Sequence, residues 1–138
     1  MQGTYSAYRL SKKLSTRDVR AITNDEIYDC YYLRYYKRGH CDTLSAPMMI
    51  VHLDACVNFG VGGASKLLKR TYNFIYLIEN IPKIFIPFYN YKVSEKQKAL
   101  FYCDIRMIKR YEIVQSKPTK KKFLKGWLRR DKKLKTYL

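Results

Sequence analysis

Acidic side chains are scarce in this 138-residue sequence, which has 11 Asp and Glu against 28 Lys and Arg and a formal net charge of +17. A field of this sign favours polyanionic partners, namely nucleic acid, an anionic membrane surface or the anionic polymers of a bacterial wall. Charge selects the class of partner without naming its member. Much of the excess lies between Lys117 and Lys135.

Three sequence patterns are absent, and each absence excludes a class of protein. The four cysteines form no CxxC pair, which argues against a zinc site, and we expect reduced thiols, no metal and no cofactor. No apolar N-terminal segment precedes a small-residue cleavage site, so we expect no signal peptide. The longest apolar stretch, Phe74 to Tyr91, contains Glu79, Lys83 and two prolines, so we expect no membrane span.

Apolar residues make up 47% of the chain, which excludes a wholly disordered polar protein. Tyrosine is unusually common, with 14 Tyr against 6 Phe and 1 Trp. A tyrosine can line a wet cleft as well as a core, because it has an apolar ring and a hydroxyl. An AT-rich coding bias explains the same excess, and the sequence does not separate the two explanations.

The spacing of apolar residues predicts a mainly α-helical fold without repeats or alternating strands. Thr23 and Glu26 form a capping box, and Ser94 with Gln97 suggests a second one. Pro82 and Pro87 interrupt the helical period, so we place a module boundary near residue 80. Helices are expected over 4–14, 24–37, 46–59, 63–72, 95–117 and from 119 onward.

The segment from Leu53 to Ala64 is the most informative. Asp54 and Asn58 share one helix face just before Gly60, Gly62 and Gly63, which predict a structural turn. Asp54 lies within an apolar stripe, so its charge needs a partner or a solvated cleft. A structural aspartate that clamps the turn and a residue at the floor of a polysaccharide cleft are both consistent with this pattern.

This segment resembles the core motif of the phage-type N-acetylmuramidases of glycoside hydrolase family 108. Further segments resemble that family in the same order, most weakly over 72–94, and the C-terminal ones look like a peptidoglycan-binding module often fused to it. These segments are Gln2 to Arg9, Arg17 to Arg20, Tyr31 to Tyr35, Cys41 to Leu44, Ala99 to Arg106 and Phe123 to Arg130.

One departure from the family is decisive for catalysis. The family's E-G-G-Y motif carries the expected general acid, and no E-G-G-Y occurs in these 138 residues. Glycoside hydrolysis needs a carboxylic acid that protonates the leaving oxygen. We expect Glu26 to be engaged in its capping box, Glu95 and Glu112 to be exposed, and Asp54 to have only a supporting role. This chain alone is therefore expected to hydrolyse little or nothing.

Two further sets of residues have competing interpretations. Phe123 and Trp127, one turn apart among lysines and arginines, suit stacking on sugars or on nucleobases, but they also suit a helix whose aromatics are buried. We expect His40 in an exposed loop and His52 off the apolar stripe of its helix. No serine or cysteine has a convincing histidine partner.

The sequence therefore predicts a lysozyme-like helical core over 1–80, incomplete at its N-terminus, and a basic helical module over 81–138. The resemblance implies peptidoglycan as the partner, action at the bacterial wall or in a virion, and a possible second chain that supplies the acid. The alternative is a non-catalytic protein that binds nucleic acid or another polyanion. The predicted substrate-binding residues are Tyr5, Tyr8, Tyr35, Asp54, Asn58 and Trp127.

Overall fold

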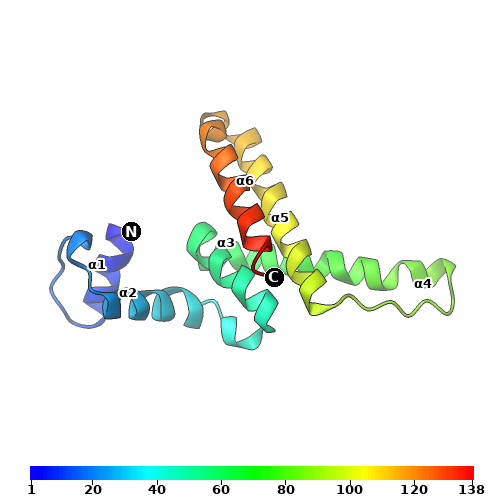
Figure 1. The fold of residues 1–138 in the computed structure, drawn as a ribbon, viewed down its shortest axis with the longest axis horizontal. Helices are drawn as coiled ribbons and strands as arrows, with labels where there is room; N and C mark the ends of the chain where they lie inside the picture. The colour runs from blue at the N-terminus through cyan, green and yellow to red at the C-terminus, as the bar shows by residue number, and fades with distance from the viewer.

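The computed structural model describes residues 1–138 as an all-helical chain without strands, which confirms the predicted mainly α fold (Figure 1). The α-helices are α1 (Gln2–Ser11), α2 (Asn24–Tyr31), α3 (Ala46–Asn80), α4 (Pro82–Phe85), α5 (Glu95–Ser116) and α6 (Lys121–Lys135). Shorter helical turns connect them: η1 (Val19–Ala21), η2 (Tyr32–Lys37), η3 (Cys41–Thr43) and η4 (Pro118–Lys120). None of the helices combines the length and the hydropathy of a membrane-spanning segment.

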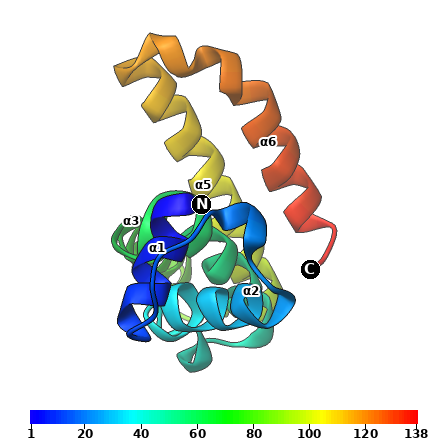
Figure 2. The same cartoon turned by 90° about the vertical axis from the view of Figure 1, so that its left-hand side faces the viewer.

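The molecule is elongated rather than spherical. Helices α1 and α2 lie at one end, α3 runs through the middle, and α4 lies at the other end (Figure 1). Helices α5 and α6 form an antiparallel hairpin that projects away from the rest (Figure 2). The base of the hairpin packs against α3, so α3 is the element to which the other parts attach.

The predicted capping box at α2 is confirmed, whereas the one predicted at α5 is present only in its first half. The Thr23 hydroxyl accepts the Glu26 amide and the Glu26 carboxylate accepts the Thr23 amide, which completes the capping box at α2. The Ser94 hydroxyl accepts the Gln97 amide at the start of α5. Ser45, which precedes α3, makes no side-chain cap bond, and its hydroxyl donates to Glu95 over 2.6 Å.

The predicted glycine turn is a bend at a single residue. Gly60 has φ 73° and ψ 159°, a conformation that is essentially restricted to glycine, and α3 changes direction there. Gly62 and Gly63 are already helical, and the helix continues to Asn80 instead of ending near Tyr72.

The core consists of two clusters. The main cluster joins α3, α5 and the end of α6 through residues such as Met48, Tyr102 and Leu134, while a small one holds Tyr5, Tyr8 and Cys30. The main core draws side chains from both sides of residue 80, and the division into modules at that residue stays a prediction. The segment after α3 is exposed, and Phe88 has 96% of its surface accessible.

Candidate functional site

A groove lined by tyrosines is the largest hollow of the structure, with a volume of about 640 Å³. It lies between the α2–η2 helix and the first half of α3. Most of its lining is apolar, and one carboxylate, that of Asp42, provides a charged group. Such a lining, mainly aromatic with few polar groups, is typical of a ligand site. The lining residues are Tyr28, Tyr31, Tyr32, Tyr36, Asp42, Met49 and Leu53.

Three of these tyrosines form a continuous stack. The rings of Tyr28 and Tyr32 are 6.3 Å apart and nearly parallel at 3°, and those of Tyr32 and Tyr36 are 5.5 Å apart at 18°. Their spacing of four residues puts them on one face of the helix. From Tyr32 the helix has π geometry, which occurs often at functional sites.

The stack is accessible to a ligand. Tyr28 is 72% exposed and Tyr32 is 43% exposed, although large aromatic side chains normally gain from burial. A sugar ring has an apolar face and a rim of hydroxyls, which matches an aromatic face with a phenol group at its edge. The groove therefore has the chemistry of a carbohydrate platform.

The structure places the predicted cleft tyrosines differently. Tyr5 and Tyr8 are 0% and 4% exposed, so their rings belong to the small core and offer no face to a ligand. Their hydroxyls donate to Glu26 and Asp29. Tyr35 is half-buried beside the Gly60 bend, in a separate hollow of about 270 Å³. The resemblance pointed to the run from Tyr31 to Tyr35 and not to the stack, whose signal in the sequence is the four-residue spacing of Tyr28, Tyr32 and Tyr36.

Asp54, predicted at the floor of a cleft, belongs to a network of ion pairs. Its carboxylate accepts hydrogen bonds from Arg106 over 2.6 Å, Arg130 over 3.0 Å and the Asn58 amide over 3.0 Å. Burial alone would raise the pKa of Asp54, but the two guanidiniums outweigh burial and hold that pKa below its usual range. Asp54 is therefore an ionised structural anchor, and Asn58 is engaged with it.

The same network continues inward. Asp131 is fully buried and accepts from Arg106 over 2.8 Å and from Arg110 over 3.1 Å. Trp127 belongs to this region, because the Arg110 guanidinium lies over its ring at 5.2 Å. The Trp127 ring also stacks on Phe123 at 5.8 Å, and Phe123 is 44% exposed.

None of the four glutamates is prepared to act as a general acid. Burial alone would raise the pKa of Glu26, but hydrogen bonds from the Thr23 amide, Tyr5, Arg17 and Arg9 lower it to about 2. A general acid needs the opposite shift, toward the working pH. The pKa values of the other three are also lowered, by the Val93 amide at Glu79, by Lys98 at Glu95 and by Arg70 at Glu112.

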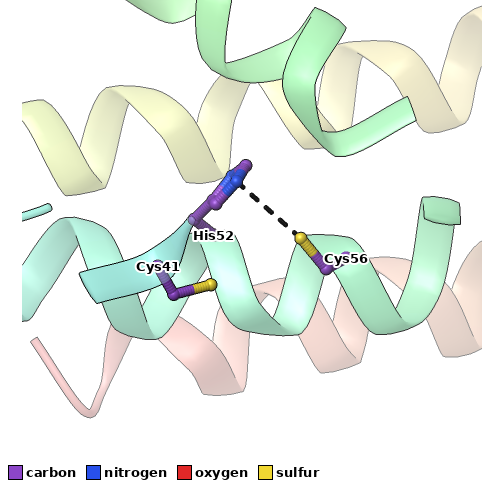
Figure 3. Close-up of side chains that lie close together, drawn as sticks. All are labelled: Cys41, His52 and Cys56. Atoms are coloured by element: carbon purple, nitrogen blue, oxygen red, sulfur yellow. Dashed lines mark hydrogen bonds between the residues drawn. The ribbon is translucent and has the colours of Figure 1, made fainter. Parts of the chain in front are cut away.

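A second cluster, of two thiols and an imidazole, lies behind the groove. Cys41, His52 and Cys56 are all buried, and their ligand atoms lie within 4.8 Å of one another (Figure 3). The prediction for His52 was wrong, because its side chain is 1% exposed and bonded within the core. Burial raises the pKa of the Cys56 thiol to about 12 and lowers that of His52. The absence of CxxC concealed the cluster, although His52 and Cys56 stand one helical turn apart.

Residues 1–60 match the family model of glycosyl hydrolase 108. The match supports a relationship between this part of the chain and that lysozyme-like family, and it contains every residue that lines the tyrosine groove. Residues 61–138 lie outside it, so the C-terminal wall-binding module stays a prediction. No curated protein and no solved structure matches the chain significantly.

Proposed function

We propose that this protein is a muramidase-related protein that binds the glycan strands of peptidoglycan in the tyrosine groove and, on its own, hydrolyses them little or not at all. The observation that carries the proposal is the stack of Tyr28, Tyr32 and Tyr36, whose first two rings are exposed and which lies inside the region related to glycosyl hydrolase 108. The stack offers exposed aromatic surface and phenol hydroxyls to sugars, and Asp42 offers an acceptor to their hydroxyls.

The expected lack of hydrolysis rests on the four glutamates and Asp54. Every glutamate has a lowered pKa, and Asp54, the acid best placed by the resemblance, is held ionised by Arg106 and Arg130. A carboxylate that is ionised at neutral pH cannot protonate the leaving oxygen of a glycosidic bond. Catalysis would thus need a proton donor from a segment or chain that carries one.

Binding is tested by co-sedimentation of the full chain with purified peptidoglycan sacculi. The salt concentration is kept high, because a charge of +17 would otherwise attach the protein to any anionic polymer. Tyr32→Ala removes the central ring of the stack and is expected to weaken binding about tenfold, equivalent to roughly 1.4 kcal/mol. The matched control is Tyr111→Ala, since Tyr111 is 54% exposed on α5 and lies outside the groove.

The outcomes separate the parts of the proposal. The groove would be refuted as the glycan site if Tyr32→Ala and Tyr111→Ala weakened the binding of sacculi equally, or if neither variant weakened it. Clearing of a peptidoglycan zymogram by the wild-type chain would refute catalytic incompleteness while leaving glycan binding intact.

A second candidate function, binding of nucleic acid or another polyanion, is favoured by the surface of α6. Asp131 is the only acidic residue of this helix, and it is buried against Arg106 and Arg110. The exposed charges of α6 are therefore all basic. It carries Lys121, Lys122, Lys125, Arg129, Arg130, Lys132 and Lys133, all exposed. Steeply salt-dependent binding of DNA or RNA, with no retention by sacculi, would favour this function over the first.

A further inference from the structure

The buried cluster behind the groove combines two elements of the fold. His52 and Cys56 lie one turn apart on α3, and Cys41 reaches them from η3 (Figure 3). The Nε2 atom of His52 is 3.7 Å from the Cys56 sulfur and 3.0 Å from the carbonyl oxygen of Gly39. Two sulfurs and one imidazole nitrogen thus lie within 4.8 Å of one another, and the Gly39 carbonyl oxygen lies beside the imidazole.

Both ring nitrogens of His52 have partners. The Tyr102 hydroxyl oxygen lies 2.8 Å from Nδ1 and 3.1 Å from the Ala64 carbonyl oxygen, and its single proton can go to either. Nε2 lies 3.0 Å from the Gly39 carbonyl oxygen, to which it donates in one tautomer of the ring. In the other tautomer Nδ1–H donates to Tyr102, and the lone pair of Nε2 is free to bind a cation.

In the tautomer with its proton on Nδ1, Nε2 and the Gly39 carbonyl oxygen are two acceptors 3.0 Å apart, which a cation between them would bind. Such a cation would also use the two sulfurs, because the ligand atoms of Cys41, His52 and Cys56 lie within 4.8 Å of one another.

We propose that Cys41, His52 and Cys56 bind a zinc ion, with the Gly39 carbonyl as the fourth ligand. Zinc favours tetrahedral sites with sulfur and nitrogen ligands at about 2.3 and 2.0 Å, which puts neighbouring ligand atoms roughly 3.5 Å apart. The distances of 3.7 Å and 3.0 Å from Nε2 are close to that value. The bond from Nδ1 to Tyr102 orients the ring as the outer partner of a metal-bound histidine normally does.

The charges of the site balance. Binding converts the two thiols to thiolates and releases two protons to solvent, so the ion and its two sulfurs have no net charge. Tight packing favours the same assignment, because a Cβ on Gly39 would lie 2.7 Å from the Cys56 sulfur and 3.3 Å from the Cys41 sulfur. Glycine at this position lets the backbone carbonyl approach the cluster.

Such an ion would fix the end of η2 and the whole of η3 to α3. Asp42, which follows the ligand Cys41, lines the tyrosine groove together with Tyr36 and Met49. The zinc site would therefore be structural, holding one wall of the groove in place. Zinc uptake itself requires no glycan, so the test below is independent of the proposed function.

The test uses the full chain, reduced and freed of metal with a chelator, and titrates it with zinc alone. We expect one zinc ion per chain, release of two protons, and an X-ray absorption spectrum that shows two sulfur ligands. Cys41→Ser, Cys56→Ser and His52→Gln are each expected to abolish stoichiometric binding. Cys30→Ser and Cys103→Ser are the matched controls, because both residues are buried free cysteines outside the cluster.

Several results would overturn the proposal. These are no zinc uptake by the reduced wild-type chain, a spectrum without sulfur ligands, or equal losses in the control variants. The proposal would also be refuted if the reduced protein bound no zinc and Cys41 and Cys56 formed a disulfide on oxidation. The wild-type spectrum decides the matter even where a variant fails to fold, since it requires no substitution.

Discussion

Replacement of Asp131 by Asn tests how the α5–α6 hairpin is held to α3. Asp131 lies on α6 and is fully buried, and its carboxylate is the charge partner of Arg106 and Arg110 on α5. Arg106 in turn reaches α3, where it donates to Asp54 and to the Val51 carbonyl. Asp131→Asn keeps the shape of the side chain, removes its charge, and turns one acceptor oxygen into a donor that faces a guanidinium.

The magnitude follows from burial. The side chains of Arg106, Arg110 and Asp131 are 0%, 4% and 0% exposed, so solvent cannot replace the lost partner. Removing one member of a buried ion pair costs about 3 to 5 kcal/mol, and here Arg110 would stay buried without a carboxylate partner, whereas Arg106 would keep Asp54. For a chain of this length we expect the melting temperature to fall by roughly 10 °C or more.

Urea denaturation followed by circular dichroism measures this loss as a lower midpoint at an unchanged slope. The control is Asp104→Asn, which also breaks an ion pair between α5 and α6, here with Lys135 over 2.5 Å. Asp104 is 53% exposed, so its pair should contribute no more than about 1 kcal/mol. If Asp131→Asn were no more destabilising than Asp104→Asn, the buried network would not be what holds the hairpin, and apolar packing around Leu134 would have to do so.

Two further substitutions test the bend and the capping box. Gly60→Ala is expected to lower the free energy of unfolding by about 1 to 3 kcal/mol, because φ at Gly60 is 73°. Gly62→Ala should instead raise it by about 0.5 to 1 kcal/mol, because Gly62 is helical and has open space around it. Equal effects of the two in urea titrations would contradict the assigned bend. Glu26→Gln tests the pH dependence of stability. The pKa of Glu26 is lowered from 4.5 to about 2 in the folded protein. The ionised carboxylate therefore stabilises the wild type above pH 4.5, and this stabilisation is lost as the pH falls toward 2. The stability difference between wild type and Glu26→Gln should therefore shrink over that range, and a constant difference would contradict the assignment.

Local signals in the sequence predicted the helices well where a capping residue marks the start. Thr23 and Ser94 lie just before α2 and α5, as expected, because a side-chain oxygen next to an unpaired backbone amide is a short-range interaction. The length of α3 was predicted less well. Three glycines suggested a longer turn, but Gly60 alone takes the non-helical conformation, and the helix resumes at once.

The site was harder to predict, because its residues meet only through tertiary packing. Tyr5 and Tyr8 show helical spacing in the sequence and therefore share one face of α1. Whether this face of α1 contacts solvent or α2 depends on how the chain reverses between the two helices. Cys41 and Cys56 are 15 positions apart, and a loop and a helix bring them together. The tyrosine stack is the exception, since a four-residue repeat within one helix is visible in the sequence itself.

The two proposed binding activities depend on different parts of the chain, and Asp54 links those parts. The groove residues all lie between Tyr28 and Leu53, inside the region related to glycosyl hydrolase 108, whereas the basic surface belongs to α6. Asp54 lies in the first part and accepts from Arg106 and Arg130 in the second. The link consists of ion pairs, and it does not involve the stacked tyrosines. Glycan binding should therefore depend on the tyrosines, and polyanion binding should depend on the charges of α6.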